Sequence, residues 1–297
     1  MPTPRGGGVG IVAAIAATLV LAIQLGPVAG TAATWWALAG LLAVAGVGWW
    51  DDHRDLPALF RLGVHLAAGL AVALAVLGWP TGPFDVAVIA VAMFWVAGMV
   101  NLWNFMDGIN GIATAQAALV ALAVTWLPGA LDGPWTLVAL GVCAACIGFL
   151  PFNFPQARIF LGDVGSGALG YSLAVLLLVA ASRSAPPQWL LLGLLPAVFI
   201  VDTGVTLAER IARGRRWWEP HREHAYQWAV RQGHSHARIT YLYTFMGLVA
   251  AIIAIGFWNS PAELAGLAFF VGIAGLCMAR LSMKRIWLMR MRRRRGR

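Results

Sequence analysis

Charged residues are scarce in this sequence. They make up 11% of the 297 residues, against about 25% in soluble globular proteins, whereas apolar residues make up 60%. The three cysteines are too few for a disulfide-stapled secreted module or a zinc-finger protein. Lysine occurs once, at Lys284, so no Walker-type phosphate loop or Schiff-base lysine is available outside the basic C-terminal stretch. The long apolar runs also exclude a disordered chain, and most of this protein is expected to lie in lipid.

Apolar runs long enough to span a bilayer occur ten times along the chain. A helix needs about 20 mainly apolar residues to cross the hydrocarbon. The first run is too long for the apolar core of a signal peptide, so we expect it to be retained. The predicted spans cover residues 9–29, 33–50, 60–79, 84–105, 112–131, 135–152, 164–182, 188–208, 240–258 and 262–281. The sequence therefore predicts an all-α polytopic membrane bundle of about ten helices, with one transmembrane domain over 1–281 and a basic tail over 282–297.

Basic residues are segregated to one side of this predicted bundle. With ten spans, 20 of the 21 fall in the termini or the even-numbered loops, and only Arg183 falls on the opposite side. Lys and Arg are enriched in cytosolic loops, so both termini are expected in the cytosol. Nine of the basic residues lie between Arg280 and Arg297, directly after a span, which indicates a membrane surface rather than nucleic acid as the partner.

Acidic residues gather on the same side, although carboxylates contribute little to topology. Nine of the twelve lie at cytosolic span ends or in cytosolic loops. Asp51 and Asp52 close an apolar span, where adjacent carboxylates raise each other's pKa unless a cation intervenes. A polar helix end is the simpler explanation, but an acid at a membrane interface is a functional hypothesis by default. A divalent metal ion is the partner that we expect for this pair.

Two further polar segments follow other spans. Asn104, Asp107 and Asn110 recur at intervals of three, beside glycines that break a helix. A helix cap followed by a turn would explain Asn110 but not three polar residues in register. Around Asp163, the glycines of 162–167 allow backbone amides to approach a phosphate or a metal at a helix start. Each segment alone is weak evidence, but on one membrane face they indicate a common site.

A fourth polar segment follows the eighth span and contains His221, Arg222 and His224. Its His-x-x-His spacing fits zinc, but no cysteine lies nearby and carboxylates dominate the other segments. Hard oxygen ligands favour Mg²⁺, with Mn²⁺ as the alternative. We expect these histidines to donate hydrogen bonds to a phosphate or nucleotide, and we expect His234 and His236 to lie in a solvated loop.

The remaining polar side chains within spans have structural explanations. Cys143 and Cys146 lie in mid-span, where a small apolar role is favoured over redox chemistry. His65 lies on an apolar face and is expected to be a hydrogen-bonded core residue. Asp202 lies nearly two turns inside a span, so we expect its side chain to face the protein interior.

Six segments of the chain together resemble the polyprenyl-phosphate N-acetylhexosamine-1-phosphate transferases. This family of integral membrane enzymes includes the phospho-N-acetylmuramoyl-pentapeptide transferase of peptidoglycan synthesis. Each segment alone is a modest match, but all six occur in the family's order between residues 2 and 227. The segments are PTPRGG (2–7), DDHRD (51–55), NFMDGING (104–111), PFNFP (151–155), FLGDVGS (160–166) and HREHAYQ (221–227).

The resemblance implies a reaction and a location. A polyprenyl phosphate, undecaprenyl phosphate in the first instance, would attack the sugar-side phosphorus of a UDP-N-acetylsugar to give a polyprenyl diphosphate sugar and UMP. Mg²⁺ is the implied cofactor, with Mn²⁺ as the alternative. The enzyme would lie in the bacterial inner membrane with its active site on the cytosolic face. No nucleic-acid partner is implied, and a homodimer is compatible with the sequence, which does not give the oligomeric state.

The resemblance also implies roles for individual residues. Asp163 is the first choice for a metal ligand, Asp51 and Asp52 would bracket the metal or the lipid phosphate, and Asp107 would complete an acidic pocket. Asp51 or Asp52 as a general base is a hypothesis, because a phosphate monoester with a second pKa of ~6 is already largely dianionic at neutral pH. The residues expected to contact the nucleotide or its diphosphate are Arg5, Asn104, Asn110, Asn153, His221, Arg222 and His224.

The sequence departs from the family pattern in two places. Relatives often carry aspartate where Asn110 stands, so this position is expected to be a hydrogen-bonding contact. Relatives also carry a span before the Pro-Arg-Gly-Gly segment, so we expect that helix to be encoded upstream or to be dispensable. The sugar is left open between GlcNAc, QuiNAc and FucNAc, with residues 210–236 expected to select it. The form of segment 221–227 favours O-antigen lipopolysaccharide, capsule or another surface polysaccharide over peptidoglycan.

Two other functions share some of these features. A CDP-alcohol phosphatidyltransferase also uses aspartates and a metal, but its Asp-Gly-x-x-Ala-Arg signature does not continue from Asp107 and Gly108. A transporter or lipid flippase with an interfacial metal site is the second alternative. Transporters place ionisable groups near the middle of the membrane, whereas the acids here lie at span ends. The enzyme hypothesis requires these acids, distant in sequence, to converge at one end of the bundle.

Overall fold

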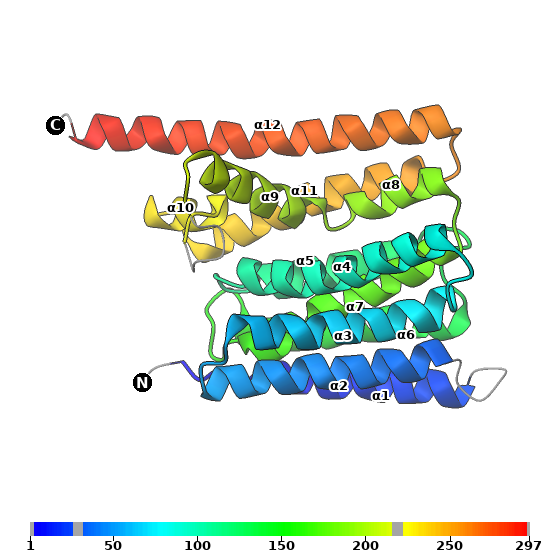
Figure 1. The fold of residues 1–297 in the computed structure, drawn as a ribbon. Coiled ribbons are helices and arrows are strands. Elements are labelled where there is room, and N and C mark those ends of the chain that lie inside the picture. The colour runs from blue at the N-terminus through cyan, green and yellow to red at the C-terminus, as the bar shows by residue number, and fades with distance from the viewer. Residues whose placement is uncertain (1–2, 26–31, 216–221, 296–297) are drawn as a thin grey trace.

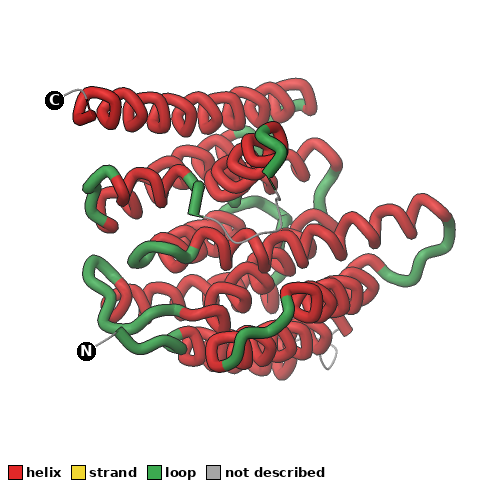
Figure 2. The backbone as a smooth tube through the Cα atoms, turned by 60° about the vertical axis from the view of Figure 1, so that its left-hand side comes forward, coloured by secondary structure: helices red, strands yellow, loops and turns green. Residues whose placement is uncertain are grey.

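The computed structural model describes residues 3–25, 32–215 and 222–295, with side chains described up to Ile286. Every regular element in these ranges is a helix, as the uniformly red coils in Figure 2 show. The fold class predicted from the sequence is therefore confirmed. The helices are α1 (Gly8–Leu25), α2 (Ala32–His53), α3 (Ala58–Leu77), α4 (Pro83–Met106), α5 (Ile112–Thr125), α6 (Gly133–Asn153), α7 (Gly162–Ser182), α8 (Pro186–Leu194), α9 (Ala197–Ala212), α10 (Ala225–Arg231), α11 (His236–Gly256) and α12 (Ala262–Arg295).

Eight of these helices are long and apolar enough to cross a membrane, and they coincide with eight of the ten predicted spans. The other two predictions differ from the structure. The helix expected over 112–131 ends at Thr125, after 14 residues, because the chain turns through Pro128 and Gly129, whose φ is +74°. The span expected over 188–208 is a pair of helices, α8 and α9, that meet at 79°. Pro196 lies at the break, where a missing N–H and ring clashes interrupt a helix.

Helix α7 is the centre of the bundle. In its most apolar stretch 94% of the residues are buried, compared with 17% for the last span, α12. Small residues allow its neighbours to approach closely. A Cβ atom added to Gly8 at the start of α1 would lie 2.3 Å from the Cα atom of Gly165. The first turn of α7, which carries Asp163, is therefore fixed by close backbone contacts.

The start of α1, the short helix α10 and the end of α12 lie at the same end of the bundle (Figure 1). Helix α12 lies along one edge and continues unbroken through residues 281 and 282 to Arg295. The predicted boundary between a membrane domain and a basic tail thus falls inside one helix, and that division stays a prediction.

Candidate active site

The start of α7 is anchored by Asp52, the next-to-last residue of α2. The two carboxylate oxygens of Asp52 accept hydrogen bonds from the backbone N–H groups of Asp163 (3.1 Å) and Val164 (3.2 Å). The approach requires glycine at position 162, where φ is +75° and a Cβ atom would lie 2.6 Å from Asp52 Oδ2. Free N–H groups at a helix start attract an anion, so Asp52 stabilises the turn that presents Asp163.

Arg61 of α3 joins Asp51 to Asp163. Its guanidinium forms an ion pair with Asp51 and lies 3.3 Å from Asp163 Oδ2. Asp51 also accepts a hydrogen bond from the backbone N–H of Leu56 (2.8 Å). From the sequence, Arg61 was counted only among the basic residues that predict the orientation of the spans. A basic residue one turn into the span after an acidic pair was the available sign, because helices joined by a short loop place their ends side by side.

Asp107 lies just beyond the end of α4 and is half-buried. Burial, followed by the nearby carboxylates of Asp163 and Asp52, raises its pKa from 3.8 to about 7. Asp107 also lines the same cavity as Asp52 and Asp163, so the acids of α2, α4 and α7 form one cluster. The four predicted aspartates therefore converge at one end of the bundle, as the enzyme hypothesis requires; their chemical roles stay predictions.

A cavity of about 570 Å³ opens beside these acids and is lined by groups of opposite charge. Three carboxyl groups line it, those of Asp52, Asp107 and Asp163, and we call this set the carboxylate wall. Three arginines also line it, Arg5, Arg222 and Arg231, together with Gln227 and His236, and we call this second set the cationic wall.

The cationic wall comes from three separate parts of the chain. The segment with Arg5 is hydrogen-bonded to the residues just before α7, since Phe160 N–H donates to Pro4 O at 2.8 Å. Arg222 precedes α10, and Arg231 ends it. His236 was expected in a solvated loop, but it lines the cavity and its Nδ1 accepts a hydrogen bond from Asn110 N–H (3.4 Å). Its position was not predictable from the sequence because its partner is 126 residues away.

The predicted asparagines hold loops together. Asn153 is buried; its carbonyl oxygen accepts from Gly111 N–H (2.7 Å) and its amide donates to Ile159 O (3.0 Å). The Asn110 amide donates to Pro155 O (3.0 Å), and the Asn104 amide donates to Ser166 Oγ (3.4 Å) on α7. Asn110 and Asn153 also line the cavity. Their predicted contacts with a nucleotide stay predictions.

The predicted phosphate-binding residues fall in different places. Arg5 and Arg222 line the cavity. His224 is 3% exposed and stacks against the rings of Phe105 and Tyr226, with centroid distances of 6.3 and 5.9 Å. His221 lies outside the described residues. The sequence analysis did not predict Gln227 or Arg231 as lining residues, although both lie on or beside the fourth polar segment.

An apolar groove of about 400 Å³ runs between α4 and α9, near the carboxylate wall. Its lining includes Phe94, Leu102, Phe105 and Ile200. Phe105 is two residues from Asp107, so the apolar groove approaches the charged cavity at this point. Behind the groove, His65 is buried and its Nδ1 lies 3.4 Å from Asn101 Nδ2, which confirms the prediction of a hydrogen-bonded core residue.

The carboxylate oxygens of the carboxylate wall suit a hard cation, although some of them already have partners within the protein. Within residues 3–25, 32–215 and 222–295, no group of three or more His, Cys, Asp or Glu side chains is placed to hold a metal ion. Asp51 and Asp52 are occupied by Arg61 and by backbone N–H groups. Asp107 and Asp163 line the cavity, and Mg²⁺ in proteins commonly binds one or two carboxylates together with water and substrate phosphates. The predicted ligand set of Asp163, Asp51 and Asp52 stays a prediction.

Comparison with known proteins identifies the family. Residues 34–181 match the model of glycosyl transferase family 4. A decaprenyl-phosphate N-acetylglucosaminephosphotransferase of Mycobacterium tuberculosis is 30% identical to this chain, over 93% of the chain and 78% of the relative. The chain belongs to glycosyl transferase family 4. The resemblance found in the six sequence segments is thus confirmed.

Other members of family 4 are also similar to the chain. A probable undecaprenyl-phosphate N-acetylglucosaminyl 1-phosphate transferase of Bacillus subtilis is 28% identical, over 73% of the chain and 63% of the relative. A phospho-N-acetylmuramoyl-pentapeptide-transferase of Desulforudis audaxviator is 31% identical, over 56% of the chain and 49% of the relative. The family 4 model match contains all four predicted aspartates, but it ends at residue 181, before the helices that carry most of the cationic wall.

Proposed function

We propose that this family 4 protein transfers an N-acetylhexosamine 1-phosphate from a UDP-sugar to a polyprenyl phosphate. The observation that carries this proposal is one cavity lined by both carboxylates and arginines, at the end of a membrane bundle and next to an apolar groove. The products would be a polyprenyl diphosphate sugar and UMP. The reaction would take place at the cytosolic face of a bacterial inner membrane.

The charged cavity suits a nucleotide sugar. Its volume of about 570 Å³ lies in the range of roughly 300 to 1,000 Å³ that small-molecule sites occupy. Arg5, Arg222 and Arg231 line it, and guanidinium groups bind phosphate oxygens with paired N–H donors. A diphosphate between these arginines and the carboxylate wall would have its sugar-side phosphorus near Asp107 and Asp163.

The apolar groove suits the second substrate. A polyprenyl chain is a long hydrocarbon that stays in the membrane, and the groove between α4 and α9 is lined almost entirely by apolar side chains. A chain in this groove would pass Phe105, and its phosphate would then reach the region of Asp107. The two substrates would meet where the groove and the cavity approach each other.

The reaction exchanges one diphosphate bond for another. A lipid phosphate oxygen forms a bond to the sugar-side phosphorus, the bond from this phosphorus to the bridging oxygen breaks, and UMP leaves with that oxygen. Catalysis of such phosphoryl transfer depends mainly on positioning and charge neutralisation. The arginines of the cationic wall orient the diphosphate. A Mg²⁺ ion held by Asp163 would supply further neutralisation of phosphate charge.

Asp107 is the carboxyl group best placed to exchange a proton. Its pKa of about 7 is near neutral pH, where proton transfer is most effective. The carboxyl oxygens of Asp51 and Asp52 are instead engaged by Arg61 and by backbone N–H groups. We therefore favour Asp107 over Asp51 and Asp52 for any proton transfer with the lipid phosphate.

UDP-N-acetylglucosamine is the sugar nucleotide that we propose. The names of the relatives from M. tuberculosis and B. subtilis both specify N-acetylglucosamine. The lipid product would begin a cell-surface polysaccharide, and an O-antigen remains the prediction drawn from the sequence.

Release of UMP by purified protein tests the proposal. The assay contains Mg²⁺, undecaprenyl phosphate and, in separate reactions, UDP-GlcNAc, UDP-GlcNAc 6-deoxy analogues and UDP-glucose. We expect UMP release only when an N-acetylsugar nucleotide and the lipid phosphate are both present. Absence of UMP with every nucleotide, together with transport of a labelled substrate across proteoliposomes, would instead support a transporter.

A further inference from the structure

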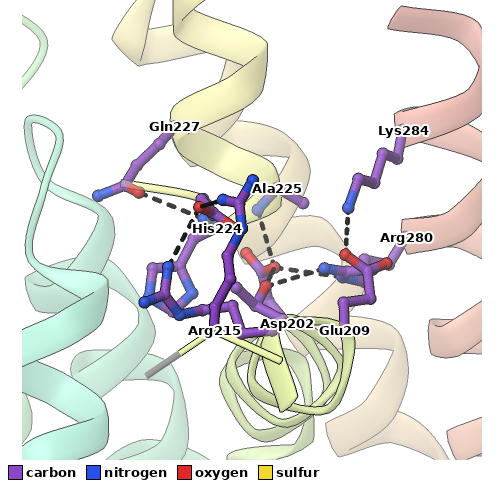
Figure 3. A network of polar contacts seen from close by, with 11 residues as sticks. Asp202, Glu209, Arg215, His224, Ala225, Gln227, Arg280 and Lys284 are labelled. Carbon is purple, nitrogen blue, oxygen red and sulfur yellow. Dashed lines mark hydrogen bonds and ion pairs between the residues drawn. The ribbon is translucent and has the colours of Figure 1, made fainter. Parts of the chain in front are cut away.

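Asp202 is a buried carboxylate that the proposed reaction does not use. It lies in α9 and is 2% exposed, which confirms the prediction that it faces the protein interior. Its Oδ1 accepts a hydrogen bond from the backbone N–H of Ala225 (2.8 Å), the first residue of α10. Its Oδ2 accepts from the hydroxyl of Tyr243 (2.7 Å) on α11. Asp202 therefore links α9 to α10 and α11. Figure 3 shows its contact with Ala225.

The last helix supplies the counter-ion of Asp202. Arg280 of α12 is also buried, and its Nε lies 3.4 Å from Asp202 Oδ1. Its other nitrogens donate to Thr206 (2.8 Å) and to Glu209 (2.9 Å), and Lys284 forms an ion pair with Glu209. Figure 3 shows Arg280 and Lys284 reaching from one helix towards Asp202 and Glu209. A buried carboxylate without such a partner would be strongly unfavourable.

The helix that Asp202 holds forms part of the cationic wall. Gln227 and Arg231 of α10 line the cavity. The other side of α10 is fixed to the carboxylate wall, because the Tyr226 hydroxyl donates to Phe105 O at 2.9 Å. Gly108 leaves room for this contact, since a Cβ atom there would lie 2.2 Å from the hydroxyl oxygen. The placement of Arg231 relative to Asp107 therefore depends on Asp202 at one contact and on Tyr226 at another.

We propose that Asp202 is a positioning residue for the nucleotide-sugar side of the cavity, and that α12 supports it through Arg280. The first N–H groups of a helix have no partner within the helix, so a carboxylate that accepts one of them fixes where the helix begins. Loss of Asp202 releases the start of α10 and displaces the Gln227 and Arg231 side chains. The apolar groove lies on the other side of Phe105 and is not lined by α10. The expected change in KM rests on the proposed function, whereas the expected displacement of α10 does not.

Kinetics of D202A and R280M test the kinetic consequence. We expect the KM for UDP-GlcNAc to rise about tenfold in each variant, as for loss of one hydrogen bond to a charged group, with the KM for undecaprenyl phosphate changed less than twofold. D202N keeps an acceptor oxygen for Ala225 N–H, and R280K keeps the charge, so both should recover most of the wild-type KM. D132A is the matched control, because Asp132 also accepts a first-turn N–H (Trp135, 3.3 Å) and pairs with an arginine, but at the start of α6.

Hydrogen exchange of residues 225–231 tests the structural consequence without any assay of function. We expect faster amide exchange in this segment in D202A and R280M, and unchanged exchange in D132A. Unchanged exchange in D202A overturns the inference whatever the activity. Equal increases of both KM values in D202A, or the same increases in D132A, also overturn it, since they would reflect general destabilisation. Failure of the wild-type protein to release UMP overturns the proposed function, whereas exchange still decides whether Asp202 positions α10.

Discussion

The two walls of the cavity are held in different ways. The carboxylate wall is built on helix ends that pack around the buried helix α7, and Asp52 fixes it through two backbone N–H groups. Asp202 likewise fixes the start of α10 through a backbone N–H, but around α10 the support consists of ion pairs between side chains: Asp202 with Arg280, and Glu223 with Arg210 (3.1 Å) and Arg215. Backbone contacts between packed helices leave little freedom, whereas long charged side chains can adopt other arrangements.

This difference suggests a division of labour within the site. The carboxylate wall lies in the region that matches the family model, and α10 lies beyond it. A rigid wall suits the groups that act on phosphate in every reaction cycle. Residues of a wall that is held by side chains can be substituted among relatives, and the preferred sugar can change with them, while the rest of the bundle is kept. Variants of the two walls should accordingly affect different kinetic constants.

Removing the charge of Asp163 should have the largest effect. D163N keeps the shape of the side chain but removes a carboxylate from the cavity, so we expect kcat to fall by roughly 10³-fold, as for loss of a group that stabilises developing charge. The melting temperature should change little, because the Asp52 contacts at the start of α7 use the backbone. UMP release and thermal unfolding in detergent measure the two effects. Retention of more than a tenth of the activity would contradict the assignment of Asp163 to the reaction.

Removing the guanidinium of Arg231 should affect binding of the nucleotide sugar. We expect R231M to raise the KM for UDP-GlcNAc about tenfold with kcat changed less than threefold, because the arginine binds phosphate oxygens in substrate and transition state alike. R213M is the matched control, since Arg213 is an exposed arginine that does not line the cavity. A fall in kcat without a change in KM would place Arg231 with the reacting groups instead.

Shortening Phe105 should affect the lipid substrate alone. The ring is 49% exposed and lines the apolar groove, so F105A removes contact area for a hydrocarbon chain. We expect the KM for undecaprenyl phosphate to rise about fivefold, in line with partial loss of an apolar contact, and the KM for UDP-GlcNAc to stay within twofold. F84A provides the control, because Phe84 is an exposed apolar residue at the opposite end of α4. Equal effects of F84A and F105A would argue against the groove as the lipid site.

The smallest expected effect concerns the pH dependence of stability. The pKa of Asp107 is raised to about 7, so the folded protein binds this proton more tightly than the unfolded chain. The resulting stabilisation is fully present below the ordinary pKa of 3.8 and is lost as the pH rises through about 7.

D107N isolates this contribution because it does not titrate. In EDTA, the melting temperature of the wild type minus that of D107N should decrease by several degrees between pH 4 and pH 8. A difference that is constant over this range would show that Asp107 is not in an acidic, buried environment.

Most of the bundle and the convergence of the aspartates were predictable from the sequence. Apolar runs give the spans, and the segregation of arginines predicts their orientation, which stays a prediction. Asp51, Asp107 and Asp163 each follow or precede a span on one side, so their proximity follows from topology. The bend at Pro196 was not predicted, because residues on both sides of it are apolar and the run of 188–208 looks continuous.

The partners of the site residues were not predictable. Arg61 and Asp163 are 102 residues apart, and their contact depends on how α3 packs beside α7. The same holds for Asp202 and Arg280, which are 78 residues apart. The sequence indicated that Asp202 faces inward, but periodicity within one helix does not identify the neighbouring helix. Such pairs are decided by tertiary packing rather than by local pattern.

A structure determined with Mn²⁺ and UDP-GlcNAc bound would show whether Asp163 binds the metal and whether the cavity binds the nucleotide sugar. Anomalous scattering locates Mn²⁺ without ambiguity, and the nucleotide marks the position of the diphosphate. We predict the metal at the Asp163 carboxylate, with the diphosphate between that ion and Arg222 and Arg231. A metal bound away from Asp163, or a nucleotide bound outside the cavity between the two walls, would contradict the account.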